Sequence, residues 1–181
     1  MLVAATLALG GCAAGEPHTG VADTTRQEPT YGELPTFLPT SSLRPDGELT
    51  GTALRPALTT EGGTVRAMTA SGSVHATVTG PMVPVEGAAN QPATTCTWTV
   101  ALTGARGRVP VAVSAFTVSD EAGNESHPRL APGSSSPPAA IEPGQTVRFE
   151  LRDVIPVGEG VLRWAPAGQL VASWDFVAET D

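Results

Sequence analysis

Few residues of this 181-residue chain have the type and spacing that catalysis or metal binding needs. None of the three histidines, His18, His75 and His127, belongs to an H-x-H or H-E-x-x-H pattern, so we expect no metal site. Ser73, His75 and Asp175 supply the residue types of a hydrolytic triad, but Ser73 lacks a G-x-S-x-G elbow and an obvious oxyanion hole. We therefore expect no catalytic residues and no cofactor.

One turn is rich in polar side chains. Asp120, Glu121, Asn124 and Glu125 lie within six positions and are able to attract a cation weakly. They lack the D-x-[DN]-x-[DN]-G pattern of a calcium loop. We interpret this segment as a solvated hairpin tip.

The clearest motif follows an apolar run over residues 2–9, which ends at two glycines and Cys12. The run is shorter than the ~20 residues that span a bilayer, but it suits the apolar region of a secretory signal. Leu9-Gly-Gly-Cys12 resembles the lipobox of bacterial lipoproteins, in which small neighbours admit the peptidase and the thiol takes a diacylglyceryl group. We expect a signal peptide over residues 1–11 and lipidation of Cys12. The protein would then sit, lipid-anchored, on the extracytoplasmic face of the cell membrane.

One element of a signal peptide is missing, because no Lys or Arg precedes the apolar run. We expect that Met1 is an internal start and that the signal peptide is truncated at its N-terminus. The alternative is a chance apolar N-terminus with no processing.

Residues 12–47 combine five prolines with Thr, Ser, Gly and acids, a composition that buries too little apolar surface to fold alone. We expect a disordered tether after the lipidated cysteine. Leu34-Pro-Thr-Phe-Leu-Pro39 interrupts its polar character. We expect this stretch to pack along the domain surface, and a peptide-docking motif is the alternative.

Composition narrows the partners and the fold. The 18 acids exceed the 10 bases, which are all Arg, and the net charge is −8. Without a basic cluster we expect no nucleic-acid partner. Aromatic residues make up 4% of the chain, and 20 Gly and 17 Pro favour a β-protein with many turns.

From about residue 48, period-2 alternation of apolar and polar side chains predicts strands. The alternating apolar positions are Val74, Ala76 and Val78; Cys96, Trp98, Val100 and Leu102; Val147, Phe149 and Leu151; and Leu170, Ala172, Trp174 and Phe176. Residues 109–118 read as a further strand with a bulge near Ala115-Phe116.

Turn residues separate these segments. Gly104–Gly107 is expected to be a short hairpin loop, Asp120–Asn124 another turn, and Glu142–Gln145 a type II turn. About seven strands in residues 48–181 predict an all-β, immunoglobulin-like sandwich. A small β-barrel is the alternative.

Three segments carry a family resemblance: Thr95–Val100, Phe116–Asp120 with Gly123, and Leu162–Pro166 with Trp174–Phe176. They look like those of actinobacterial lipoproteins with a telokin-like, immunoglobulin-like domain, as in secreted mycobacterial antigens and domains of unknown function. The resemblance implies no catalytic residues.

Two further residues have alternative interpretations. Cys96 shares its phase with Trp98 and Val100, which favours a buried, inert thiol, although an odd cysteine in an exported protein is also able to form an intermolecular disulfide. Trp164 lies near a loop and is a weak candidate for a ligand platform, with packing at the end of the sandwich favoured.

We therefore expect a non-enzymatic, lipid-anchored module for recognition or accessory binding in the cell envelope, with a cell-envelope protein as its partner. The alternative is a small secreted ligand carrier or hydrolase that uses a pocket at the end of the sandwich. A deep pocket with convergent polar groups would favour this alternative, whereas a flat surface with an apolar patch would favour a protein partner.

Overall fold

A computed structural model describes residues 48–84 and 92–179. The chain divides into two units, Met1–Ser42 and Leu43–Asp181, and every described residue belongs to the second. The predicted signal peptide, Cys12 and the predicted tether of residues 12–47 lie outside the described residues.

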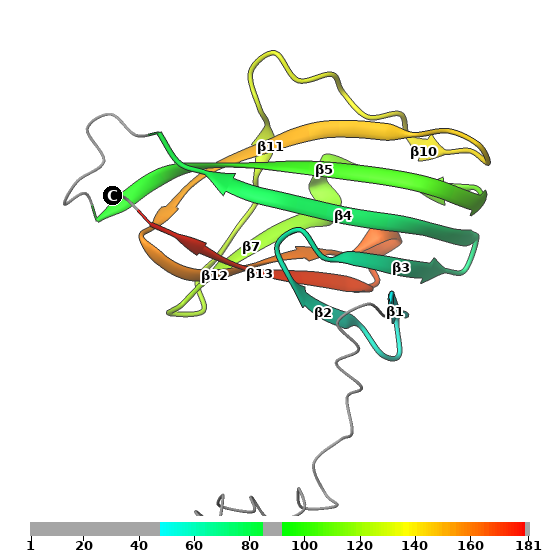
Figure 1. Ribbon diagram of the computed structural model, residues 1–181, viewed down its shortest axis with the longest axis horizontal. Helices are drawn as coiled ribbons and strands as arrows, with labels where there is room; N and C mark the ends of the chain where they lie inside the picture. The colour runs from blue at the N-terminus through cyan, green and yellow to red at the C-terminus, as the bar shows by residue number, and fades with distance from the viewer. Residues whose placement is uncertain (1–47, 85–91, 180–181) are drawn as a thin grey trace, which may run out of the picture. The chain divides into compact units, whose positions relative to one another are not determined.

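Two β-sheets face each other and form a sandwich (Figure 1). The first sheet has six strands in the order β1-β3-β4-β5-β11-β9. These strands are β1 (Leu49–Gly51), β3 (Thr64–Thr69), β4 (Gly72–Met82), β5 (Ala93–Gly107), β9 (Arg129–Leu130) and β11 (Val147–Pro156). All neighbours in this sheet are antiparallel except β1 and β3.

The second sheet has five strands in the order β2-β13-β12-β7-β8. These strands are β2 (Ala57–Thr60), β7 (Phe116–Asp120), β8 (Glu125–Ser126), β12 (Gly158–Trp164) and β13 (Ala172–Ala178). Strand β2 runs parallel to β13, the last strand, and the other neighbours are antiparallel. Seven strands of five or more residues make up most of the described sandwich, so the predicted immunoglobulin-like fold is confirmed.

The core lies between the sheets and follows the predicted periodicity except at Leu170, which precedes β13 (Ala172–Ala178) and is half-buried, while Val171 is buried. Cys96, Trp98, Val100 and Leu102 of β5 are fully buried. Aromatic rings join the two layers, since Trp98 meets Phe176 edge-to-face with ring centroids 5.1 Å apart. An edge-to-face pair of this kind contributes about 0.5–1.5 kcal/mol beyond the area that it buries.

Residues 109–118 do not form one bulged strand, so that prediction was wrong. The chain forms the two-residue strand β6 (Val109–Pro110), then a 3₁₀ turn, η1 (Val113–Ala115), and only then enters β7. Strand β6 pairs with β10 (Ala140–Ile141) in a separate two-stranded ribbon. A second 3₁₀ turn, η2 (Pro166–Gly168), separates β12 from β13.

Gly104–Gly107 is not a hairpin loop, so the prediction of a loop at these residues was wrong. These residues continue β5, whose Arg106 lies opposite Ser73 of β4. The register shifts between Ser73 and His75, and Gly104 has a φ of +60°. A glycine in the left-handed region marks a β-bulge as readily as a turn. The two other predicted turns are confirmed, because backbone hydrogen bonds close Asp120–Asn124 and Glu142–Gln145.

No helix in the described part of the chain is long and apolar enough to cross a membrane.

Candidate functional site

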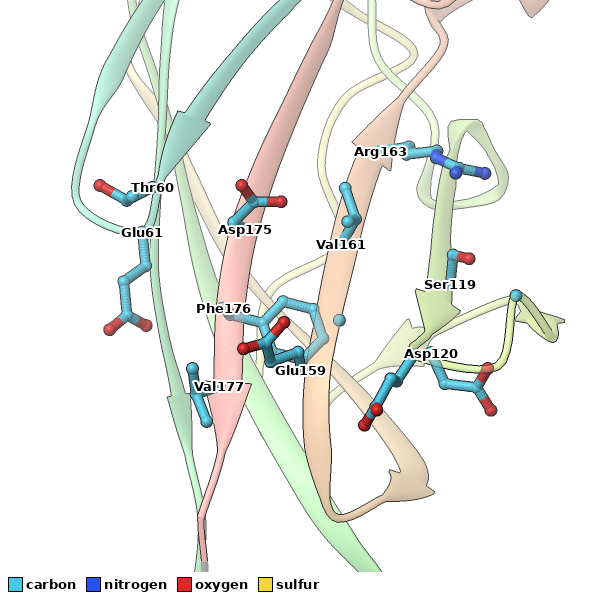
Figure 2. Close-up of a pocket in the computed structure, with 13 residues that line it drawn as sticks. Thr60, Glu61, Ser119, Asp120, Glu159, Val161, Arg163, Asp175, Phe176 and Val177 are labelled. Carbon is cyan, nitrogen blue, oxygen red and sulfur yellow. The ribbon is translucent and has the colours of Figure 1, made fainter.

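An open groove of about 620 Å³ lies on the outer face of the five-stranded sheet (Figure 2). Four adjacent strands form its centre, where Thr60, Asp175, Val161 and Ser119 lie side by side in register. Side chains alternate along a strand, so the residues next to these outward positions in the sequence point into the core. Trp174, before Asp175, and Leu162, after Val161, are both buried. The buried core therefore fixes which side chains reach the groove.

Carboxylates dominate the charge of the groove. Glu61, Asp120, Glu121, Glu159 and Asp175 line it, against a single guanidinium, that of Arg163. That guanidinium, on β12, forms an ion pair across β7 with Glu125 of the edge strand β8. The groove therefore has a strongly negative potential that no free cation of its lining offsets.

Apolar side chains lie between these carboxylates. Val161 lies at the centre, and Val177 is 47% exposed beside it. Under the sheet, the ring of Phe176 packs against Gly160, where a Cβ atom would stand only 2.5 Å from the ring. An open apolar floor between carboxylates suits a partner that carries both positive charge and apolar surface.

The ionisable side chains of the groove are carboxylates and one guanidinium. Its hydroxyls belong to Thr60 and Ser119, and no histidine or cysteine lies among the lining residues to activate them. Within residues 48–84 and 92–179, no three His, Cys, Asp or Glu side chains are placed to hold a metal ion.

Trp164 does not serve as a ligand platform. Its side chain is 0% exposed, and its ring stacks on that of Phe116 with centroids 5.8 Å apart. Its position in β12 gives it the same inward phase as Leu162, so packing at this position prevails over exposure near the loop. The favoured interpretation of packing is therefore confirmed, and the weak candidate, a ligand platform, is wrong.

Cys96 is fully buried, as the alternation predicts. Burial raises the pKa of its thiol to about 12, with a smaller contribution from the negative charge of Asp153, directly opposite on β11. A protonated thiol enclosed in the core cannot reach a second protein without unfolding, so the native domain does not support the intermolecular disulfide.

The structure does not bring the three residues of the triad candidate together, and no described histidine lines the groove. His75 is partly exposed and its Nε2 lies 2.9 Å from a carboxylate oxygen of Glu48. Ser73 and His75 belong to the six-stranded sheet, whereas Asp175 lies on the outer face of the other sheet. His127 follows β8 in a loop, and His18 lies outside the described residues.

The polar turn at Asp120 has both a structural and a surface role. Asp120 accepts hydrogen bonds from the backbone and side-chain nitrogens of Asn124, at 2.8 and 2.9 Å. The Asn124 side chain and the backbone amides of the turn lower the pKa of this carboxyl. The solvated hairpin tip is confirmed, and it also forms one wall of the groove.

A second cavity, of about 310 Å³, opens at the opposite end of the sandwich. Its lining is mostly apolar and includes Met68, Pro110, Pro166 and Val171. Its polar lining atoms come from Thr69, Ser71 and Gln169, without a charged group. This cavity lacks the convergent polar cluster expected of a hydrolase.

No protein-family model and no curated protein sequence matches the chain. Among solved structures, it is similar to the crystal structure of MPT63, a secreted protein from Mycobacterium tuberculosis. The TM-score is 0.46 with 17% sequence identity, and the alignment covers 67% of this chain and 98% of that chain. Membership of an actinobacterial lipoprotein family remains a prediction from the sequence.

Proposed function

We propose that the protein is a non-catalytic, lipid-anchored binding module of the cell envelope, held through Cys12 and exposed outside the cytoplasmic membrane. The anchor and the localisation rest on the N-terminal motif. The observation that carries the binding role is the open groove over β2, β13, β12 and β7, with exposed apolar side chains between carboxylates.

The groove favours a protein partner. It is broad and open rather than deep, and a flat sheet face of this kind matches protein surfaces better than small molecules. Its five carboxylates favour a partner segment that carries Arg or Lys beside apolar residues.

The anchor is tested by mass spectrometry of the protein from the membrane fraction. We expect Cys12 to carry a diacylglyceryl group at the N-terminus of the processed chain. An unmodified Cys12 in an unprocessed chain would reject the anchor without affecting the groove.

The groove is tested with a photo-crosslinking residue placed at Val161, in intact cells. We expect a defined envelope protein to be crosslinked there, and the same residue at Thr99, on the outer face of the other sheet, serves as the matched control. Charge reversal by Glu159→Lys with Asp175→Lys is expected to abolish the crosslink at Val161. Equal yields at both positions would reject the groove as the binding surface.

A further inference from the structure

Charged residues are segregated between the two ends of the sandwich. Strand register places the segments 52–56, 69–72, 104–108, 142–146 and 165–171 at one end. The charged residues of these segments are Arg55, Arg106, Arg108 and Glu142. We call this the arginine end. Among the described residues, the charged side chains at the opposite end are Glu61, Asp120, Glu121, Glu159 and Glu179, all of them acids.

Two of the three arginines at the arginine end have no ion-pair partner among the described residues. Arg108 pairs with Glu142 at 3.0 Å, whereas no carboxylate of residues 48–84 and 92–179 lies within ion-pair distance of Arg55 or Arg106. In a chain of net charge −8, this end is therefore a local positive surface.

Apolar side chains are exposed beside these arginines. Leu54, next to Arg55, is 95% exposed and is the most exposed large apolar residue of the described chain. Met68 is 37% exposed and lines the apolar cavity of about 310 Å³ together with Ala53. An exposed apolar side chain at the same end of a domain as basic residues is an arrangement that suits binding at a lipid–water interface.

The geometry points to a docking surface for an anionic phospholipid bilayer: we propose that Leu54 enters the headgroup layer while Arg55 and Arg106 meet the phosphates. The inference rests on the proposed function, which already holds the protein at a membrane. The 36 positions from Cys12 to Glu48 span at most about 120–130 Å, so the anchor leaves the arginine end within reach of the bilayer.

A second copy of the chain is the competing occupant, because its acidic groove would also attract arginines. The projecting Leu54 favours the bilayer, since it stands clear of the surface rather than forming a recess that receives a partner. Docking of the arginine end also favours the bilayer electrostatically, because it turns the acidic end and the acidic groove away from a negatively charged membrane.

The test uses the full chain carrying Cys12→Ser, so that no acyl chain contributes, and cosedimentation with vesicles. We expect binding to vesicles of phosphatidylglycerol and phosphatidylcholine, weak binding to phosphatidylcholine alone, and loss of binding as salt increases. Arg55→Gln and Arg106→Gln should each weaken binding about five-fold. Leu54→Ser should weaken binding and leave its salt dependence unchanged.

Arg148→Gln is the matched control, since it removes the same charge from the exposed face of β11. An effect of Arg148→Gln as large as that of Arg55→Gln would overturn the proposal, because net charge alone would then explain the binding. Two other outcomes would overturn the proposal.

If soluble polyphosphate binds as tightly as the vesicles and Leu54→Ser has no effect, the ligand is a phosphate and not a bilayer. If vesicles do not bind and the arginine variants abolish self-association in sedimentation equilibrium, the occupant is a second copy of the chain. Because all variants have the same residues 1–47, differences between them report on the arginine end alone. Mass spectrometry of Cys12 tests the lipid anchor separately.

Discussion

The indole Nε1 of Trp174 donates a hydrogen bond of 2.9 Å to the carbonyl oxygen of Gly63, 111 positions earlier in the chain. Trp174 belongs to β13 of the five-stranded sheet, and Gly63 immediately precedes β3 of the six-stranded sheet. The contact therefore ties the two layers together beside the groove. Among the described residues, the indole nitrogens of Trp98 and Trp164 are buried without an acceptor.

This difference predicts unequal effects of the same substitution. Trp174→Phe removes the donor and leaves the Gly63 carbonyl without its partner, which we expect to cost about 1–3 kcal/mol in addition to the loss of packing. Trp98→Phe removes a similar volume from an equally buried site but sacrifices no hydrogen bond. Urea unfolding should therefore show Trp174→Phe as the less stable variant. Equal free energies of unfolding would show that the Gly63 contact contributes nothing.

Alternation predicted the strands correctly where one face of the strand is buried in the core and the other faces solvent along its length. Val147, Phe149 and Leu151 point inward and the charged residues between them point outward, as the period of two requires. The bulge at Gly104 escaped prediction because a glycine with positive φ suits a turn and a bulge alike. Only the register of β4 opposite Gly104 distinguishes them.

The groove was not predicted because it depends on which strands become neighbours. Thr60 and Asp175 lie 115 positions apart and meet only through the parallel pairing of β2 with β13. The alternation showed that Asp175 faces away from the core, but it carried no information on the residues beside it. Trp164 is a different case: packing was the favoured interpretation, and its inward phase with Leu162 on β12 buries it despite its nearness to a loop.

A second prediction concerns the Cys96 thiol. Its pKa in the folded state, about 12, exceeds the ordinary value of 9.0. Between these values the unfolded chain loses the thiol proton and the folded chain keeps it, so stability falls as the pH rises, by at most about 1.4 kcal/mol per pH unit. Cys96→Ala should remove this dependence in urea unfolding between pH 8 and 11. The native thiol should also react with iodoacetamide at pH 8 far more slowly than the denatured thiol, and comparable rates would contradict its burial.

A third prediction concerns the contact under the groove. A Cβ atom at position 160 would lie 2.5 Å from Cζ of Phe176 and 3.1 Å from the carbonyl oxygen of Ser119. Gly160→Ala should therefore destabilise the fold by about 1–3 kcal/mol through overpacking. Phe176→Leu shortens the side chain that clashes, so the double variant should lose less than the sum of the two single variants. Additivity within about 0.5 kcal/mol would mean that the ring moves aside at no cost.

The hairpin tip gives a prediction for acid solution. The Asn124 side chain and the backbone amides of the turn lower the pKa of the Asp120 carboxyl below 3.8. The folded state therefore favours the ionised form, and the resulting stability is present above pH 3.8 and lost as the pH falls through the lower folded pKa. Asp120→Asn keeps the shape of the side chain but not its charge, so wild type should be more stable than this variant at pH 6. Thermal unfolding should show this difference shrinking as the pH falls below 3.8. A difference that stays constant from pH 6 to pH 2 would show that the charge of Asp120 does not stabilise the turn.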